Sequence, residues 1–381
     1  MQRTVQRRVR SPAAVASADS GVSFAPPPPS AKFDYVIVGA GAAGCALAAR
    51  LSEDANVTVL LLEAGEDLTA FKHVAPALAS QPARHTDADW RFDADLGMGP
   101  PPPLHVSPTM VSAATTTSHD FAATMSSRGS TVLSRGKTLG GTAALGNLLH
   151  VRGDPAGFDA WAAEEGCEGW DYDHMLPYFK RSEALRGYSD RVGVRGAGGP
   201  MPVGPAASGN NLHRCTKHFL ARANDVLAAD ANLRLRTTAH TAAIVTPAHG
   251  EDLFDYNGPI HVGAGVAQVS ATNHRRCDPA WAYLQPSVLV RPNLHVSTGV
   301  RATRIIFEGD RATGVRYCCP TASGGSGGSG GGRNGSCGGT AGSTLDGTGG
   351  GNCNAATAGP EHSALATREV LVCAGAVGSS W

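Results

Sequence analysis

The hydrophobic pattern of the chain becomes regular at about residue 33. A short apolar run at residues 35–38 is followed by a glycine-rich turn and then by helically spaced apolar positions up to Leu51. A second apolar run at residues 57–62 ends at Glu63. Strand, glycine turn, helix and strand in this order form a βαβ unit, so the sequence predicts an α/β fold that starts with a Rossmann-like unit.

Later parts of the chain carry further periodic segments. Residues 218–229 have the spacing of an amphipathic helix. Apolar runs predict strands at residues 294–298, 302–307, 312–317 and 369–373. We expect these strands to belong to the same domain as the first βαβ unit. Residues 191–290 are expected to form part of a separate α+β domain.

Three segments lack such a pattern and are expected to lie outside the folded core. Residues 97–128 are rich in proline and threonine, and residues 321–365 consist mainly of glycine, serine and threonine. Residues 1–32 contain four arginines, a single acidic residue and a proline run, which predicts a disordered tail or a transit peptide. A transit peptide would direct the protein to an organelle, a chloroplast rather than a mitochondrion, whereas a plain tail would leave it in the cytoplasm.

The composition argues against several classes of partner. The 32 Lys and Arg residues balance 32 Asp and Glu residues, so no overall charge favours nucleic acid or an anionic membrane. No apolar run reaches the about 18 to 20 residues that a membrane-spanning helix requires. The 9 cysteines include no C-x-x-C spacing typical of a zinc or dithiol site, so we expect reduced thiols and no metal. The expected ligand is a small neutral or weakly polar molecule.

The glycine turn carries the first chemical signal. Gly39, Gly41 and Gly44 have the spacing G-x-G-x-x-G, directly after an apolar strand and at the start of a helix. In dinucleotide-binding proteins these glycines permit the tight turn, the approach of backbone to a pyrophosphate and close packing of helix and strand. Glu63 ends the second strand about 20 residues further on, where a carboxylate binds ribose hydroxyls. The predicted dinucleotide site also includes Ala42, Ala43 and Ala64.

Downstream segments resemble the glucose-methanol-choline (GMC) flavoenzymes. The segment Arg135-Gly-Lys-Thr-Leu-Gly-Gly-Thr142, together with Val151-Arg-Gly-Asp-Pro-Ala156, is similar to the first signature of that family. The resemblance continues through Asp89-Trp90, Gly169-Trp-Asp-Tyr172, Leu176-Pro-Tyr-Phe179, Arg291-Pro-Asn-Leu294 and Cys373-Ala-Gly-Ala-Val-Gly-Ser379. It covers nearly the whole chain outside the tail and the insertions, and it implies a flavoprotein oxidoreductase that binds FAD.

The resemblance also implies where FAD is bound. Paired glycines in the second segment let backbone N–H groups face an anion without obstruction by side chains. Later residues would contact the adenosine end and the point where the last strand meets the dinucleotide. The implied contacts are Arg135, Gly136, Leu139, Gly140, Gly141 and Thr142 for the flavin and pyrophosphate, Ala302 for the adenosine end, and Ala374 and Gly375 for the last strand.

Two positions near the flavin depart from the family pattern. The family has an asparagine six residues before the arginine of its Arg-Gly pair; counted back from Arg152, that place is Gly146, so Asn147 is expected to substitute. The position before it, where some members attach FAD covalently through histidine, is Leu145, so we expect non-covalent FAD. The nearby His150 is expected to be a packing or polar-contact residue.

The family's catalytic residues have no counterpart in the sequence. In the family, the segment that matches residues 373–379 leads into the rest of the substrate domain and a His-His or His-Asn pair beside the flavin. This chain ends at Trp381, so the catalytic residues are unknown and we expect a chain truncated before them. The family reaction transfers a hydride from an alcohol carbon to flavin N5 while histidine handles the hydroxyl proton.

The resemblance assigns roles to the expected domains. Residues 33–190 would begin the FAD-binding domain, and residues 191–290 would form part of the substrate domain. Residues 291–320 and 366–381 would return to the FAD-binding domain. We expect a small-molecule substrate, while the oligomeric state is unknown.

Three functions are open at this point. The first is an FAD-dependent oxidoreductase acting on the CH–OH group of an alcohol. The second is an enzyme similar to the algal fatty acid photodecarboxylases of the same family, which the transit-like tail and the Cys373-Ala-Gly run favour. The Arg-Gly-Asp-Pro-Ala and Gly-Trp-Asp-Tyr segments, in contrast, look closer to the choline-dehydrogenase-like members and favour the first function. The third is a non-catalytic FAD-binding remnant. These patterns specify neither the substrate nor the electron acceptor.

Overall fold

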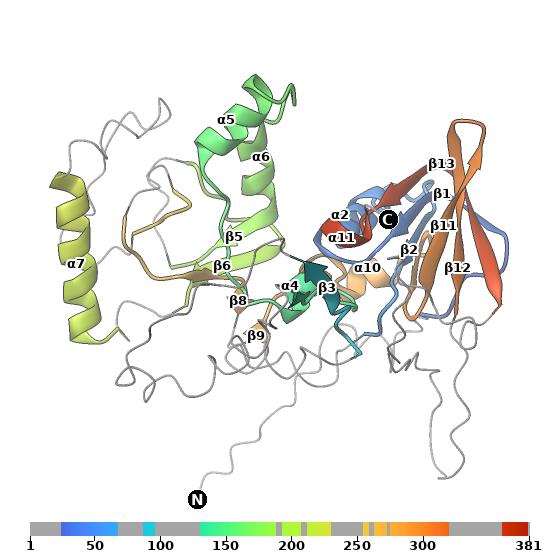
Figure 1. The fold of residues 1–381 in the computed structure, drawn as a ribbon, viewed down its shortest axis with the longest axis horizontal. Helices are drawn as coiled ribbons and strands as arrows, with labels where there is room; N and C mark the ends of the chain where they lie inside the picture. Colours follow the sequence, from blue (N-terminus) through green and yellow to red (C-terminus); the bar gives the residue numbers. More distant parts are fainter. Residues whose placement is uncertain are drawn as a thin grey trace, which may run out of the picture. The chain divides into compact units, whose positions relative to one another are not determined.

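The computed structural model describes residues 24–67, 87–95, 130–187, 193–206, 212–229, 254–258, 263–272, 275–319 and 360–379. These residues fall into two compact units (Figure 1). The first, here named the middle unit, holds the described residues between 146 and 291. The second, the large-sheet unit, holds the described residues between 24 and 145 and those after 291.

A six-stranded sheet forms the large-sheet unit. Its strand order is β10 (Leu294–Ser297), β2 (Val59–Leu62), β1 (Ala31–Val38), β13 (Glu361–Val372), β12 (Arg311–Cys318) and β11 (Arg301–Glu308). The first four strands are parallel, and β12 and β11 continue the sheet in antiparallel pairs. β1 and β2 are neighbours connected through α2 (Ala42–Leu51). The prediction of an α/β fold with a Rossmann-like βαβ unit is therefore confirmed.

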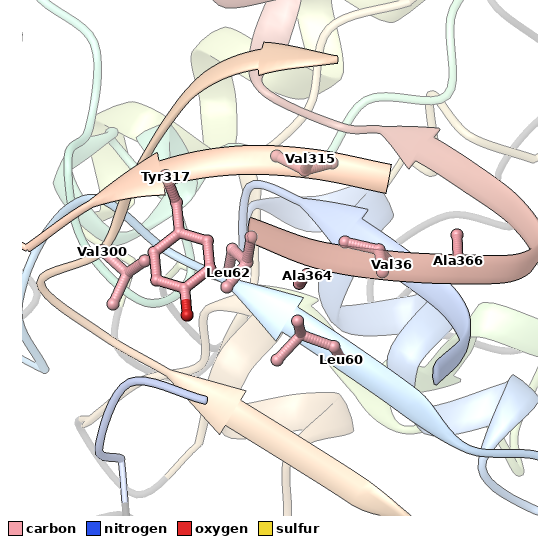
Figure 2. Close-up of a cluster of buried hydrophobic side chains, with 8 residues drawn as sticks. All are labelled: Val36, Leu60, Leu62, Val300, Val315, Tyr317, Ala364 and Ala366. Carbon is pink, nitrogen blue, oxygen red and sulfur yellow. The ribbon is translucent and has the colours of Figure 1, made fainter. Parts of the chain in front are cut away.

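The core of this unit is a cluster of apolar side chains on the sheet. All four residues of β2 are buried, as expected for a central parallel strand. The cluster drawn in Figure 2 consists of Val36, Leu60, Leu62, Val300, Val315, Tyr317, Ala364 and Ala366. Burial of a large apolar side chain contributes about 1.5–3 kcal/mol. Since the cluster draws on β1, β2, β12 and β13, it joins the first strand of the chain to the last.

Short elements follow the carboxyl ends of β1 and β13. α2 begins a few residues after β1, and α11 (Gly375–Gly378) begins a few residues after β13. β3 (Phe92–Asp95) pairs with β4 (Ser130–Leu133), and a loop leads from β4 to α4 (Thr142–Leu145). In open α/β sheets, ligands bind beyond the carboxyl ends of the parallel strands, so this edge is the expected place for a site.

The middle unit combines helices with short strands. Three of its helices begin at an aspartate whose carboxylate accepts a first-turn N–H, namely Asp154, Asp171 and Asp278. The elements are α5 (Pro155–Ala163), α6 (Tyr172–Ser182), β5 (Glu183–Leu185), β6 (Met201–Pro205), α7 (Arg214–Ala229), β7 (Gln268–Val269), β8 (Ala271–Thr272), β9 (Arg275–Arg276), α9 (Pro279–Tyr283) and α10 (Pro286–Leu289). β5, β6 and β7 form one small sheet, while β8 and β9 pair separately.

The observed boundaries differ from those expected at three places. Residues 24–32 are not a tail: β1 already begins at Ala31, and the proline run before it hydrogen-bonds to the sheet through its carbonyl groups. β13 begins at Glu361, inside the range assigned to the low-complexity insertion, because Ala364 is buried in the core. The change between units lies after residue 145 rather than near residue 190.

The last difference has a physical cause. Glu183, at the end of α6, is bound by two arginines of the middle unit, and these bonds join α6 to the small sheet.

The residues 97–128, expected to form an insertion, lie outside the described residues. So do residues 321–359 of the low-complexity segment and residues 1–23 of the expected transit peptide.

Candidate functional site

The turn between β1 and α2 contains glycines that admit no side chain. Gly39 has φ +98°, and a Cβ atom there would lie 2.5 Å from the carbonyl oxygen of Cys373, just beyond β13. A Cβ atom on Gly44 would overlap the carbonyl oxygen of Gly39. Both residues must therefore be glycine for β1, α2 and the end of β13 to meet.

Gly41 differs from the other two glycines of the motif. Apart from its chain neighbours, the nearest atom to a Cβ built on Gly41 would be the Cα of Gly141, at 3.9 Å. Gly41 is the N-cap of α2, it supplies no side-chain cap, and the first turn of α2 has no acidic residue. Ala42 and Ala43, which follow it, are exposed. The first-turn N–H groups and the positive end of the helix dipole therefore favour an anion here.

The second glycine segment packs directly onto this turn. The Gly140 N–H donates to the carbonyl oxygen of Ala40 over 2.8 Å. Gly141 has φ +59°, and a Cβ atom there would lie 2.7 Å from the Cα of Gly41. The Gly136 N–H donates to Oγ1 of Thr142 over 3.1 Å, which closes the loop on itself. The two predicted glycine segments thus form one continuous backbone surface, with Leu139 buried beneath it.

The Glu63 carboxylate connects two loops of the site, the glycine turn and the loop after β2. Its Oε2 accepts the N–H of Ala40 and its Oε1 accepts the N–H of Gly65, each over 2.9 Å. Burial raises the pKa of Glu63 to about 7, although the two backbone N–H groups and Lys137 act in the opposite direction. Each carboxylate oxygen keeps a second lone pair, so a ribose hydroxyl can donate to the same group. Glu63 is therefore both a support of the glycine turn and a candidate ribose ligand.

Gly65 was not among the predicted site residues. A Cβ atom there would overlap the carbonyl oxygen of Lys137, so β2 and the second glycine segment meet at this glycine. Ala40, which bonds both Glu63 and Gly140, was missed as well. The sequence signal for both was their position: Ala40 lies inside the first motif, and Gly65 follows the predicted acid by two residues.

An aromatic ring with two cations lies beside the second glycine segment. The Nζ atom of Lys137 lies 5.1 Å from the centre of the Trp90 ring, and the guanidinium carbon of Arg301 lies 5.4 Å from it. Asp89 fixes the loop because its carboxylate accepts the Arg135 N–H over 2.9 Å. Trp90 was part of the recognised resemblance, whereas nothing in the sequence marked Arg301.

Of the remaining predicted site residues, some lie at the glycine turn or next to Glu63 and others do not. Ala374 lies against Gly39, since its Cα would be 2.9 Å from a Cβ built there, and Gly375, with φ +83°, follows it. Ala64 lies between Glu63 and Gly65. Ala302 is in the edge strand β11, and its side chain packs on the core cluster. Arg135 donates from NH1 to the carbonyl oxygen of Ser134. Asn147 is exposed and belongs to the middle unit.

The middle unit contains a buried charge network that the sequence did not reveal. Glu183, which is fully buried, accepts hydrogen bonds from Arg152 and from Nε of Arg195, the latter over 3.0 Å. Arg195 also donates to both carboxylate oxygens of Asp255 over 2.6 Å. Burial by itself would raise the pKa of Glu183, but hydrogen bonds from His150 and Arg195 outweigh it and lower that pKa to about 2. Two further members, Asn257 and Gln268, complete the network.

His150 is part of this polar environment. Its Nε2 lies 3.6 Å from Oε2 of Glu183, and its carbonyl oxygen accepts a hydrogen bond from Asn257 over 2.9 Å. Its surroundings match the polar-contact role expected from the sequence. Within the described ranges, no group of three or more His, Cys, Asp or Glu side chains could hold a metal ion. Among the same residues, no helix is long and apolar enough to cross a bilayer.

Comparison with known proteins places the chain in a family. The profile described as GMC oxidoreductase matches residues 33–326. An uncharacterised GMC-type oxidoreductase of Rhodococcus erythropolis is 32% identical over 74% of this chain and 46% of its own length. An oxygen-dependent choline dehydrogenase of Staphylococcus xylosus is 32% identical over 75% of this chain and 42% of its own length. The chain thus spans less than half the length of these curated relatives.

Solved structures agree with this placement. The crystal structure of pyridoxine 4-oxidase from Mesorbium loti has a TM-score of 0.59 and 25% sequence identity, and the match covers 90% of this chain and 50% of that one. A formate oxidase structure, 20% identical with a TM-score of 0.55, shares the fold. The glycine turn, the second glycine segment and the sequence comparisons lead to one conclusion: the chain belongs to the GMC oxidoreductase family.

Proposed function

We propose that this chain binds FAD without a covalent link, with its pyrophosphate at the N-terminus of α2. The observation that carries the proposal is the contrast among the glycines. Cβ atoms on Gly39, Gly44 and Gly141 would meet protein backbone, whereas a Cβ atom on Gly41 would meet nothing closer than 3.9 Å. A glycine that the protein itself does not require indicates a close approach by a ligand.

The surrounding residues fit the other parts of a dinucleotide. The first-turn N–H groups of α2 and the backbone of the second glycine segment offer donors to phosphate oxygens. Glu63 offers a carboxylate to the adenosine ribose. Lys137 adds a positive charge near Glu63 and suits an anionic ligand. The proposed contacts also include Ala42, Ala43, Ala64, Arg135, Thr142, Asn147, Ala302, Ala374 and Gly375.

We infer that the protein is an oxidoreductase of CH–OH groups, and that its large-sheet unit holds the cofactor and its middle unit contributes to the substrate domain. FAD, when bound, supplies the hydride acceptor for this chemistry. The family membership supports the reaction class, and the choline dehydrogenases among the relatives favour a small alcohol as substrate. The residues of this chain described above bind and orient the cofactor, and we assign none of them as the proton-transferring base.

The first experiment tests cofactor binding alone. The purified full chain is titrated with FAD, and binding is measured by flavin fluorescence quenching and by the shift in unfolding temperature. We expect saturable binding that denaturation with acid releases, as for a non-covalent flavin. A wild-type chain that is folded by circular dichroism but retains no FAD would overturn the proposal.

A second experiment separates the three functions. The FAD-loaded protein is mixed anaerobically with a panel of small alcohols, including choline, and flavin bleaching is recorded. Alcohol-dependent bleaching supports the oxidoreductase. Hydrocarbon formation from a long-chain fatty acid under blue light, without such bleaching, supports the photodecarboxylase-like alternative. Stable FAD binding with neither reaction supports the remnant.

A further inference from the structure

The residues just before β1 form a strap across the large sheet. This N-terminal strap, Phe24–Ser30, contacts β10 at one edge of the sheet and the neighbouring strands β13 and β12, which β2 and β1 separate from β10. The Phe24 carbonyl accepts the N–H of Thr298 over 3.2 Å. The Ala25 carbonyl accepts Oγ–H of Ser297 over 2.8 Å and bonds Nε2 of His295 over 3.1 Å.

The other end of the strap is fixed at β12 and β13. The Tyr317 hydroxyl donates to the Pro27 carbonyl over 2.9 Å, and Pro27 is buried. The Ser30 N–H donates to the Ser363 carbonyl over 2.8 Å. Figure 2 shows the Tyr317 ring at one end of the core cluster, beside Val300, with its hydroxyl directed away from Val315.

The proline run limits how the middle of the strap can bind the sheet. Residues 26–29 are all proline and have no backbone N–H, so they cannot add a paired strand to the sheet. Instead, the Pro27 carbonyl accepts the Tyr317 hydroxyl and the Pro28 carbonyl accepts the N–H of Ala31. A proline segment is already stiff before it docks, so fixing it costs less conformational entropy than fixing an ordinary loop.

Ser297, which the strap holds, also holds the end of β2, together with the residues that follow it. The Ser297 carbonyl accepts the Glu63 N–H over 2.8 Å. The Val300 N–H donates to the Glu63 carbonyl, and the Gly299 N–H donates to the Gly65 carbonyl, each over 2.9 Å. Glu63 then binds Ala40 in the glycine turn through its carboxylate. One series of hydrogen bonds therefore runs from the strap through residues 297–300 to Glu63.

We propose that the N-terminal strap is a positioning element of the cofactor site. By fixing Ser297 and Thr298 it fixes Glu63, and this sets the affinity for the adenosine half of FAD. The inference rests on the proposed FAD-binding function. It predicts that weakening the strap lowers affinity for FAD, which carries the adenosine ribose, and leaves the affinity for FMN, which lacks it, unchanged.

The test uses full-length variants that remove one donor each. Ser297→Ala removes a hydroxyl bonded to Ala25, and Tyr317→Phe removes only the hydroxyl bonded to Pro27. Ser297→Thr keeps a hydroxyl and serves as the rescue. Thr303→Val is the matched control, because its hydroxyl bonds Glu361 on the same sheet and does not touch the strap. Dissociation constants for FAD and FMN are measured for each protein.

Each strap variant is expected to bind FAD about 2- to 10-fold more weakly, the range for one lost hydrogen bond. FMN affinity should be unchanged, and Ser297→Thr and Thr303→Val should bind both flavins like wild type. Equal weakening of FAD and FMN, or no weakening, overturns the inference. If wild type binds no FAD, the proposed function fails instead.

A measurement without cofactor tests the strap independently. Hydrogen exchange is followed in the peptide that contains residues 59–65 of the unliganded protein. The double variant of Ser297→Ala and Tyr317→Phe should exchange this peptide faster than wild type, because the bonds of Glu63 and Gly65 open more often. Unchanged exchange shows that the strap does not hold the end of β2.

Discussion

Gly41 and Gly141 face each other so closely that a methyl group on Gly141 would lie 2.7 Å from the Cα of Gly41. Gly141 also has φ +59°, which an L-residue with a side chain adopts only under strain. The two glycine segments can therefore join this closely only because residue 141 has no Cβ atom, whereas a Cβ atom on Gly41 would have ordinary contact distance to Gly141. This contact brings together the first βαβ unit and the loop before α4.

Replacing Gly141 by alanine should separate the two segments. We expect Gly141→Ala to lower the free energy of unfolding by about 1–3 kcal/mol, from strain and from the clash with Gly41, as measured by urea unfolding. Gly157→Ala is the control: Gly157 lies inside α5 with nothing within 4 Å of its Cβ position. It should stabilise the protein by about 0.5–1 kcal/mol. Equal stability of Gly141→Ala and wild type would contradict the proposed contact.

Replacing Gly41 should act on the ligand rather than on the fold. Its Cβ position has no atom closer than 3.9 Å and its φ of −80° suits alanine, so Gly41→Ala should unfold at the wild-type temperature. FAD affinity should fall at least about 10-fold, because the methyl group occupies the space of the phosphates. Gly44→Ala provides the comparison. Its methyl group would overlap the carbonyl oxygen of Gly39, so this variant should lose stability as well as FAD affinity. Unchanged FAD affinity in Gly41→Ala would remove the main support for the proposed function.

Much of the large-sheet unit follows from local sequence patterns. The apolar run before Gly39, the G-x-G-x-x-G spacing and the run ending at Glu63 each act within a few residues, so the sequence contains their full physical cause. The expected strands at residues 294–298 and 302–307 also appear in this unit, and the expected helix at residues 218–229 appears in the middle unit, with differences in their ends.

Other features depend on contacts between distant segments and could not be predicted. The arginines that bind Glu183 come from residues 152 and 195, and nothing local marks them as partners. Gly65 is required only because the Lys137 backbone crosses it. The proline run resembles a tail by composition, but a buried donor, the Tyr317 hydroxyl, gives the Pro27 carbonyl a partner.

Glu63 should make the stability of the unliganded protein depend on pH. Its pKa of about 7 in the folded state lies above its ordinary value of 4.5, so the folded protein keeps a proton that the unfolded chain releases. This proton's contribution to the free energy of unfolding is complete below about pH 4.5 and is lost as pH rises towards 7. The loss is on the order of 3 kcal/mol. Urea unfolding across this range should show the loss in wild type.

Glu63→Gln should remove this pH dependence. The amide cannot ionise, so the unfolding free energy of the variant should change over the same pH interval only through the other titrating groups. Glu53→Gln, at an exposed acid paired with Arg50, should keep the wild-type profile. A Glu63→Gln protein that loses as much stability as wild type between these pH values would show that Glu63 is already ionised in the folded state.

The charge network of the middle unit provides the last prediction. Glu183→Gln keeps the size of the side chain but removes the carboxylate that the buried guanidinium group of Arg152 binds and one of the two that Arg195 binds, so stability should fall by about 3–5 kcal/mol in urea unfolding. Because the pKa of Glu183, about 2, lies below the usual 4.5, wild type should also lose stability as pH falls through this interval, and the variant should not. Glu361→Gln, at an exposed ion pair with Arg316, should show no measurable change. Equal effects of the two substitutions would mean that the buried network does not stabilise the unit.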